Sequence, residues 1–435
     1  YVLFGTLLDR AGGGNYMMQV SFAALGHMRG GPAKVAVVSS ALNGLISGSS
    51  VSNVVSGGIF TIPLMKKSGY GGVKAGAIET MSSVNGQIMP PVMGAAAFLM
   101  VEYVAITNVE VMKHAVLPAI ISYIALFYIV HLEALKAGLQ GLPRRSQATA
   151  GQRLLALAMN ASGFVVLAGA VYYGIGWVKT LLPDAAVFIV GAGLLGAYVA
   201  LMWVASRQPE LTLDDPNAPV FELPETQPTL LSGLHYLLSV VVLIWCLMVE
   251  QMSPALSAFW ATLFMIFVMV TQRPLMALLR GHDGLGAAVK VGLMDLVAGL
   301  EAGARNMIGI GVATAAAGII VGTVSLTGIG LVMTEVVELL SGGNLMLMLV
   351  LVAFISLVLG MGLPTTANYI VVSTLMAPVV VELGAQSGLL VPLIAVHLFV
   401  FYFGLMADVT PPVGLASFAA AAIARTDPIK TGITA

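Results

Sequence analysis

Long apolar segments dominate the pattern of hydrophobic and polar positions along this chain. A helix needs about 20 mainly apolar residues to cross the hydrocarbon core of a bilayer, and several segments reach that length. They are residues 113–135, 153–179, 183–206, 230–250, 253–271 and 305–327. The pattern therefore predicts an all-α membrane protein with these segments as ordinary spans.

Two further apolar regions are each divided by a short polar run. The four pieces are residues 32–48 and 51–66, which GSSVSN joins, and residues 344–361 and 365–383, which GMGLPTTAN joins. Each piece is too short for an ordinary span. We therefore expect two re-entrant helical hairpins, 32–66 and 344–383.

A pair of prolines interrupts the helix that follows each hairpin. The predicted halves are residues 73–86 and 90–107 around Pro90 and Pro91, and residues 388–407 and 412–424 around Pro411 and Pro412. Proline has no backbone N–H to donate and clashes with the preceding turn, so a helix stops there. The sequence thus predicts two broken helices, one after each hairpin.

The hairpins and broken helices read as two copies of one unit. Adding 315 to three positions of the first copy gives the same residue types in the second, since Asn53, Pro63 and Gly69 become Asn368, Pro378 and Gly384. Basic residues flank the first hairpin and are absent from the ends of the second, and basic loops face the cytoplasm. The copies therefore read as an inverted repeat, which is typical of secondary transporters.

The composition indicates that the chain lies in a lipid bilayer. Apolar residues make up 58% of the 435 positions and charged residues 9%, which a water-soluble domain could not carry without large exposed apolar patches. A net charge of −1 argues against a nucleic-acid surface. Tyr1 lies in an apolar run without an initiator Met, so we expect further sequence upstream.

Some segments are neither spans nor hairpins. Residues 207–229 are Pro-rich and acidic, which predicts a polar linker. Residues 284–303 mix charge with apolar positions three and four apart, which predicts an amphipathic helix along the membrane surface, and similar surface helices are expected at 13–28 and 328–340. The expected units are a first repeat at 1–112, a connecting scaffold at 113–304 and a second repeat at 305–435.

The hairpin tips are candidate ligand sites. Backbone that leaves the helix inside a membrane is tolerated where its polar groups line a cavity or bind a ligand. Hydroxyl and carbonyl oxygens at the tips are hard donors of the kind that alkali cations accept. A single break is commonly a structural kink, but two matched breaks with matched hairpins favour a ligand cavity.

Polar side chains also precede the proline pairs. Asp408 is a candidate cation ligand or proton carrier, because a carboxylate at membrane depth is costly and usually functional, and a helix-end cap is the alternative. Its counterpart, 321 positions earlier, is the neutral Gln87, so the two sites need not be equivalent. Glu79 is a second candidate proton carrier. His397 fits a buried, hydrogen-bonded residue better than a functional one.

The motifs around these residues resemble those of one transporter family. They are GGPAKVAVVSSALNGLISGSSVSNVVSGG, NGQIMPPVMGAAAF, GMGLPTTANYIVVSTLMAPVV and GLMADVTPPVGLASFAAAAIA. Together they resemble the DctM-like large permease of a TRAP (tripartite ATP-independent periplasmic) transporter, in the subclass that works with TAXI-type binding proteins. The similarity covers nearly the whole chain.

The resemblance implies a fold, a function and partners. The fold would be that of the ion-transporter superfamily, an elevator in which hairpins and broken helices move against a scaffold. The function would be import of an organic acid, commonly a dicarboxylate, across the bacterial or archaeal cytoplasmic (inner) membrane, coupled to Na⁺ or H⁺ without another cofactor. The partners would be a TAXI-type extracytoplasmic binding protein and a four-helix small membrane subunit, which an upstream fusion could supply. The additional helices around 153–206 depart from better-known members.

Carried over by position, the resemblance makes the tips and breaks the ion and substrate site. The expected cation-binding residues are Gly48, Ser49, Ser52, Asn53, Asn85, Gly360, Thr366, Asn368, Asp408 and Thr410. The expected substrate-binding residues are Ser49, Ser50, Asn53, Gln87, Thr365, Thr366 and Asn368. Because no Lys or Arg lies in either tip or break, an anionic substrate would meet helix N-termini, hydroxyls, amides and bound cations.

Other functions fit the sequence less well than transport with a binding protein. A stand-alone sodium-coupled dicarboxylate symporter of the same superfamily would share the paired hairpins and need no binding protein. An ion channel would not need two inverted tips. An intramembrane enzyme lacks support, since the sequence contains no HExxH, no GxSxG and no Cys/His cluster. We therefore expect a transporter and not an enzyme.

Overall fold

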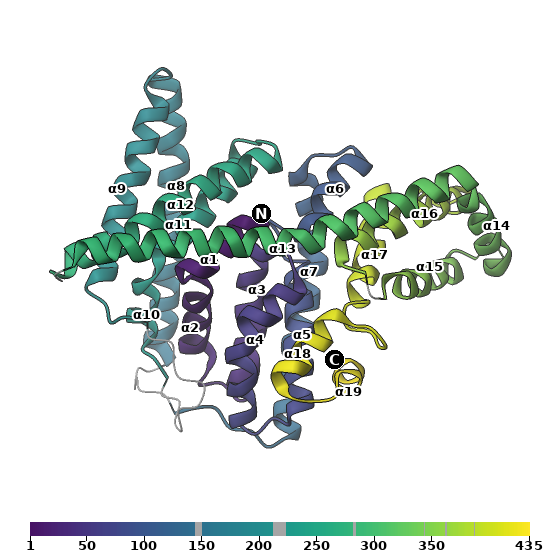
Figure 1. Cartoon of the computed structure of the whole chain (residues 1–435), viewed down its shortest axis with the longest axis horizontal. Coiled ribbons are helices and arrows are strands. Elements are labelled where there is room, and N and C mark those ends of the chain that lie inside the picture. Colours follow the sequence, from purple (N-terminus) through teal and green to yellow (C-terminus); the bar gives the residue numbers. More distant parts are fainter. Residues whose placement is uncertain (144–149, 212–222, 282–283, 343, 362, 387) are drawn as a thin grey trace.

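The computed structural model describes residues 1–143, 150–211, 223–281, 284–342, 344–361, 363–386 and 388–435. Over these ranges its regular secondary structure is helical (Figure 1). The helices long and apolar enough to cross a membrane are α7 (Asn108–Lys136), α9 (Ala186–Ser206), α12 (Pro254–Arg280) and α16 (Thr365–Gln386). The all-α membrane class expected from the sequence is confirmed.

The first hairpin consists of α3 (Gly31–Ser47) and α4 (Ser50–Lys67), close to the bounds that the sequence predicts. The tip turns at Gly48, whose φ of +57° favours glycine. The Ser49 hydroxyl then accepts a hydrogen bond from the Ser52 N–H and caps α4. Two small residues, Gly48 and Ser49, thus reverse the direction of the chain between α3 and α4.

The hairpin packs closely against α5 (Gly72–Gly86), the first half of the first broken helix. A methyl group added at Gly44 of α3 would lie 2.4 Å from the Gly86 carbonyl oxygen and 2.5 Å from its Cα. Backbone therefore meets backbone here, an approach that small residues permit between membrane helices.

The second hairpin consists of α15 (Leu345–Gly360) and α16, and it packs against α17 (Leu393–Met406). The Asn344 side chain accepts from the Leu347 N–H and caps α15. Gly362 of the predicted tip lies outside the described residues. The predicted order of hairpin followed by broken helix is therefore present in both copies.

Each broken helix contributes one half to each hairpin. The second half of the first break, α6 (Gly94–Val104), contacts α16 and α17, whereas α18 (Leu415–Ala424), the second half of the second break, contacts α4 and α5. Figure 1 shows the yellow α18 beside the purple α4. The peptide bond between the two prolines is cis in both breaks. The exchange joins the two copies into one packed body.

One long helix, α13 (Leu285–Thr327), replaces the predicted surface helix at 284–303 and the predicted span at 305–327. Its 43 residues extend for about 65 Å at 1.5 Å per residue. Glu301 and Arg305 pair across the predicted boundary, and a methyl group at Gly303 would lie 2.7 Å from Leu3 of α1 (Val2–Ala11). Glycines on one side of this segment pack against α1 and α12, whereas apolar side chains such as Met294 and Val297 are exposed. Because the helix continues without a break to Thr327, the prediction of two separate helices was wrong.

Two further expectations need correction. The span at 230–250 is divided into α10 (Thr226–Ser232) and α11 (Leu234–Ile244), which continues as a π-helix over Trp245–Val249, and the pair is bent by 59°. α10 also takes the last residues of the expected linker at 207–229, of which 212–222 lie outside the described residues. The expected surface helix at 13–28 is α2 (Gly13–Leu25), which buries Tyr16, Met17 and Phe22. Gly233, at the bend between α10 and α11, leaves room for the Tyr16 ring of α2, since a methyl group there would lie 2.2 Å from that ring.

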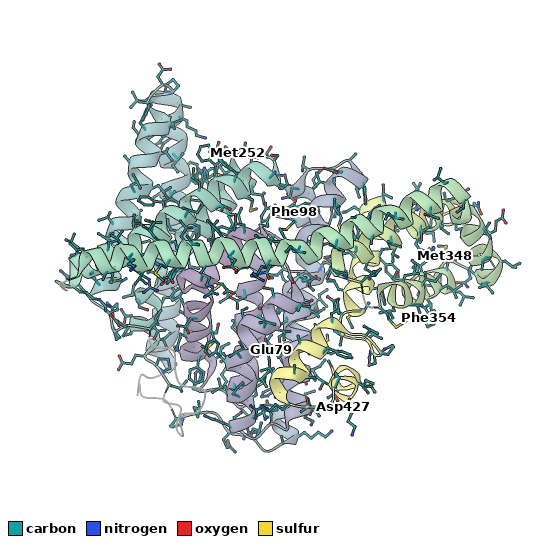
Figure 2. The ribbon with its side chains drawn as sticks, viewed as in Figure 1. Glu79, Phe98, Met252, Met348, Phe354 and Asp427 are labelled. Carbon is teal, nitrogen blue, oxygen red and sulfur yellow. The ribbon has the colours of Figure 1, made fainter. Side chains whose placement is uncertain are left out.

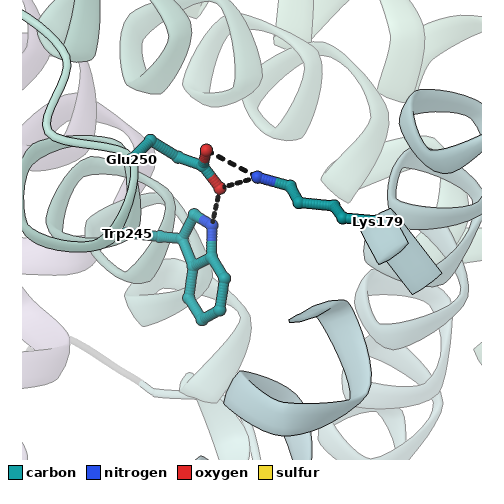
Figure 3. Close-up of polar contacts among 3 residues, drawn as sticks. All are labelled: Lys179, Trp245 and Glu250. Atoms are coloured by element: carbon teal, nitrogen blue, oxygen red, sulfur yellow. Dashed lines mark hydrogen bonds and ion pairs between the residues drawn. The ribbon is translucent and has the colours of Figure 1, made fainter. Parts of the chain in front are cut away.

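The additional helices α8 (Ala150–Leu181) and α9 project beyond the rest of the molecule in Figure 1. α9 packs on α11 and α12. Figure 3 shows a polar contact that fastens the end of α8, in which the Lys179 ammonium pairs with the Glu250 carboxylate and the Trp245 indole N–H donates to the same carboxylate at 2.8 Å. Glu250 therefore has two protein partners at this end of α8.

We expect Gly44→Ala to destabilise the first hairpin, because the added methyl group would separate α3 from α5. A core overpacking of this kind costs roughly 1–3 kcal/mol, and the purified protein should unfold at a lower temperature. Gly169→Ala in α8 is the control, because no atom lies within 4 Å of the added methyl group. Equal unfolding temperatures of the two variants would contradict the close α3–α5 contact.

Candidate functional site

One carboxylate joins the two hairpin tips. Asp408, which follows α17, accepts hydrogen bonds at its Oδ2 from the Ser50 hydroxyl at 2.7 Å and from the Thr365 hydroxyl at 3.0 Å. Its side chain is buried, and its carbonyl oxygen accepts from the Ala416 N–H across the proline break. The structure therefore brings together the tips and the second break, as the sequence predicts.

The two hydroxyl donors occupy equivalent places in the two copies. Ser50 and Thr365 are 315 positions apart, the offset of the repeat, and they are the first residues of α4 and α16. Both helices therefore begin at the same carboxylate. The partial positive charge of their N-termini favours a negative group there. The arrangement explains why Asp408 is tolerated in an apolar chain without a basic partner in the sequence of either tip.

A matched pair of asparagines lies one turn further along each of these helices. The Asn53 amide donates to the Ser40 carbonyl oxygen at 3.0 Å, and the Asn368 amide donates to the Gly404 carbonyl oxygen at 2.9 Å. Both side chains are 1% exposed. Neither amide Oδ1 has a hydrogen-bond partner among the described residues.

These amide oxygens are the strongest ligand signal at the tips. A buried acceptor without a partner costs roughly 1–3 kcal/mol, so native proteins rarely retain one without a reason. The Oε1 atom of Gln87, at the end of α5, is also buried without a partner in the described part of the chain. Three buried amide oxygens are therefore free to accept a cation or a donor group of a substrate.

The glycines of the site are required by close packing. A methyl group at Gly360 would lie 2.1 Å from the Asn368 amide nitrogen, and one at Gly404 would lie 2.9 Å from it. At the first tip, a methyl group at Gly48 would lie 2.7 Å from the Cα of Gly94. Gly360 and Gly48 thus shape the site through their size.

Several predicted site residues make contacts away from the joined tips. Asn85 accepts a hydrogen bond from Ser122 of α7 at 3.1 Å, and the Thr410 hydroxyl donates to the Met406 carbonyl oxygen within its own turn. Ser52 and Thr366 are half-buried on the first turns of α4 and α16. Their predicted ligand roles stay predictions.

Glu79 lies below the first tip, inside the bundle of α3, α4 and α5, where Figure 2 labels it. It is fully buried and accepts hydrogen bonds from the hydroxyls of Thr61, Ser83 (3.2 Å) and Ser40 (3.4 Å). These three hydroxyls were not predicted from the sequence. In the sequence they stand out only as polar residues inside otherwise apolar helices. That they share Glu79 as a partner depends on how the three helices pack.

His397 of α17 is also buried and forms a hydrogen bond with the Tyr369 hydroxyl at 2.7 Å. Its ring also lies near the ring of Tyr103, with centroids 6.2 Å apart. A partner for the ring explains this histidine as a packed core residue, in agreement with the interpretation from the sequence.

A family model identifies the chain. The model described as "Tripartite ATP-independent periplasmic transporter, DctM component" matches residues 1–192 and residues 185–435, which together span the whole sequence. The chain belongs to this family. Members of the DctM family are multi-pass inner-membrane components of transporters and not enzymes.

Two of the similar curated proteins are TRAP transporter large permeases. The C4-dicarboxylate TRAP transporter large permease DctM of Pseudomonas aeruginosa is 28% identical over 208 residues, which are 46% of this chain and 45% of that protein. The ectoine TRAP transporter large permease TeaC of Halomonas elongata is 27% identical over 178 residues, 40% of each chain. The protein y4mL of Sinorhizobium fredii is 28% identical over 167 residues, 38% of this chain and 39% of that protein. Each alignment thus spans less than half of the relative.

We expect Asp408→Asn to weaken cation binding at the tips roughly ten- to a hundredfold. The variant keeps the shape of the side chain and removes the negative charge, and interactions of charged groups contribute about 1.5–3 kcal/mol. The rise in unfolding temperature that NaCl produces relative to choline chloride measures this binding. Asp427→Asn is the control, since Asp427 caps α19 (Pro428–Thr434) at the surface. An unchanged response to NaCl in Asp408→Asn would overturn the assignment.

Proposed function

We propose that the chain is the large permease of a TRAP-type secondary transporter that imports an organic acid, coupled to a gradient of Na⁺ or H⁺. The observation that carries the proposal is the meeting of two equivalent hairpin tips at Asp408. Family membership and the name of the C4-dicarboxylate relative support the class of reaction and suggest a dicarboxylate as the substrate.

The oxygen atoms at the tips support ion coupling. A cation at the tips would bind the Asp408 carboxylate and the unpartnered amide oxygens of Asn53 and Asn368. Bound cations would order the non-helical backbone and place positive charge where a substrate carboxylate needs it. Substrate affinity would then depend on the cation, which is the thermodynamic basis of symport.

The packing of the broken helices supports an elevator mechanism with two re-entrant hairpins in an inverted repeat. Because α6 and α18 are exchanged between the hairpins, the two tips would move as one body. The helices α1, α9, α11, α12 and α13 pack on one another and would form the scaffold. The body would carry the joined tips from one side of the membrane to the other.

Proposed partners follow from the family. A TAXI-type binding protein outside the cytoplasmic membrane would deliver the substrate, and a four-helix small membrane subunit would complete the scaffold. The additional helices α8 and α9, which Lys179 and Glu250 fasten to the π-helix, would extend the scaffold laterally into the bilayer.

Uptake into proteoliposomes tests this function. The full-length chain, with its small subunit, is reconstituted, and uptake of radiolabelled dicarboxylates is measured under imposed Na⁺ or H⁺ gradients with and without the binding protein. We expect uptake that requires a gradient and the binding protein. Uptake without the binding protein would indicate a stand-alone symporter, and uptake indifferent to both gradients would refute coupling.

We further expect Asn53→Ala and Asn368→Ala each to lower gradient-driven uptake roughly tenfold, because each removes an oxygen ligand from the tips. Asn306→Ala is the control, since that amide lies on α13 and contacts Thr6 at 3.4 Å. Reconstituted amounts are matched by quantifying folded protein. Wild-type rates in both tip variants would argue against the amide oxygens as ligands.

A further inference from the structure

Glu79 occupies a pocket that the tip site does not use. Its side chain is 0% exposed, and hydroxyls reach it from three helices, Ser40 from α3, Thr61 from α4 and Ser83 from α5 itself. Two glycines of α4 bring that helix close, since a methyl group at Gly58 would lie 3.2 Å from the Glu79 Cγ. The pocket therefore surrounds a carboxyl group with hydroxyls.

No basic side chain bonds to Glu79 among the described residues. Lysines of α5 and of the helices packed on it have other partners: Lys34 of α3 contacts His131, Lys66 of α4 donates to the Ala424 carbonyl oxygen, and Lys74 of α5 pairs with Glu133 of α7. Lys67 lies beside Lys66 at the end of α4, Asp427 and Lys430 belong to the surface turn of α19, and α18 carries no titratable side chain. The negative charge of Glu79 would thus have hydroxyl dipoles as its partners.

The chemistry of the pocket suits a proton. Burial without a counter-ion disfavours the carboxylate, whereas three hydroxyl donors favour it, so the opposing effects bring the two protonation states closer in energy. Each hydroxyl can donate or accept. The protonated carboxyl group could donate to the Thr61 oxygen without any change in the set of partners. Because the hydroxyls contact the carboxylate directly, they leave no room for a larger ion. The species that the carboxyl group can bind and release is therefore a proton.

Ser40 connects this pocket to the first tip. Its hydroxyl donates to Glu79 at 3.4 Å, and its carbonyl oxygen accepts from the Asn53 amide at 3.0 Å. The other end of the same amide is the unpartnered Oδ1 at the tip. One residue of α3 therefore contacts both the buried carboxyl group and a candidate tip ligand.

We propose that Glu79 binds and releases a proton during transport, and that Ser40 transmits its protonation state to the Asn53 amide at the first tip. This inference rests on the proposed transport function and identifies H⁺ as a coupling ion. Proton uptake converts the carboxylate to the acid and weakens its hold on the Ser40 hydroxyl. Ser40 and the Asn53 amide then shift together, which changes the affinity of the tip. Asp408 stays the cation ligand.

The helices α3 and α5 each carry two adjacent serines, of which one contacts Glu79 and the other serves as its control. Ser40→Ala removes a donor to Glu79, whereas the neighbouring Ser39 donates to the Ala36 carbonyl oxygen of its own helix. On α5, Ser83→Ala removes a donor to Glu79, whereas Ser82, equally buried, donates to the Ile78 carbonyl oxygen. Ser39→Ala and Ser82→Ala therefore control for the loss of a buried hydroxyl.

The first experiment measures transport by the reconstituted full-length complex at a fixed cation gradient, with and without an inward H⁺ gradient. We expect the H⁺ gradient to stimulate the wild type and both control variants. In Glu79→Gln the stimulation should fall roughly tenfold, while uptake driven by the cation gradient persists. Stimulation of Glu79→Gln at the wild-type level would overturn the proposal. Absence of any wild-type uptake would instead refute the proposed function.

The second experiment does not depend on transport. Infrared difference spectra of the protein in liposomes, between alkaline and acidic solution, report the C=O stretching band of a buried carboxylic acid. We expect one component of this band that Glu79→Gln abolishes and Ser82→Ala retains, beside any contribution from the buried Asp408. Ser40→Ala, which keeps the carboxyl group, should retain the component and shift the pH at which it appears. A band in folded Glu79→Gln equal to that of the wild type, or a Ser40→Ala midpoint equal to that of Ser39→Ala, would refute the assignment.

Discussion

The hydrogen bonds of Asp408 to Ser50 and Thr365 are the constraint on which the architecture depends. Within a bilayer, each interruption of a helix exposes backbone and side-chain groups that need partners. The two interruptions at the tips and the one at the second proline pair satisfy one another at a single carboxylate. A negative group shared by two helix N-termini needs no lysine or arginine, which agrees with the apolar composition of both hairpins.

The exchange of half-helices gives this contact its mechanical support. Because α18 packs on the first hairpin and α6 on the second, neither tip can leave the carboxylate without separating helices of the other copy. Glycines allow the required approach, as at Gly44 and Gly86, where backbones touch. Polar contacts and close packing therefore act on the same set of helices, and the same packing lets Ser40 contact both Glu79 and the Asn53 amide.

Local patterns predicted the parts of the fold that depend on local rules. The tip runs, the proline pairs and the offset of 315 located both hairpins, and the Asn53 and Asn368 pair was visible because equal residues recurred at equal spacing. Longer-range contacts were not visible. The sequence did not show that α13 is one helix, because the hydropathy is the same whether Gly303 packs against Leu3 or faces the bilayer surface. Likewise, the sequence suggested Glu79 but not Ser40, Thr61 and Ser83, since only the packing of three helices assembles them.

The continuous helix α13 also connects the helices α1 and α12 to the second hairpin. A helix of 43 residues with an unbroken series of backbone hydrogen bonds resists bending along its length. The residues at its two ends differ from those of its interior. Gly284 and Gly328 both have positive φ, at +119° and +67°, and a side chain at either would meet open space. Rotation at these two glycines costs less than bending the helix between them. The helix is therefore a stiff segment with a glycine in the left-handed region at each end.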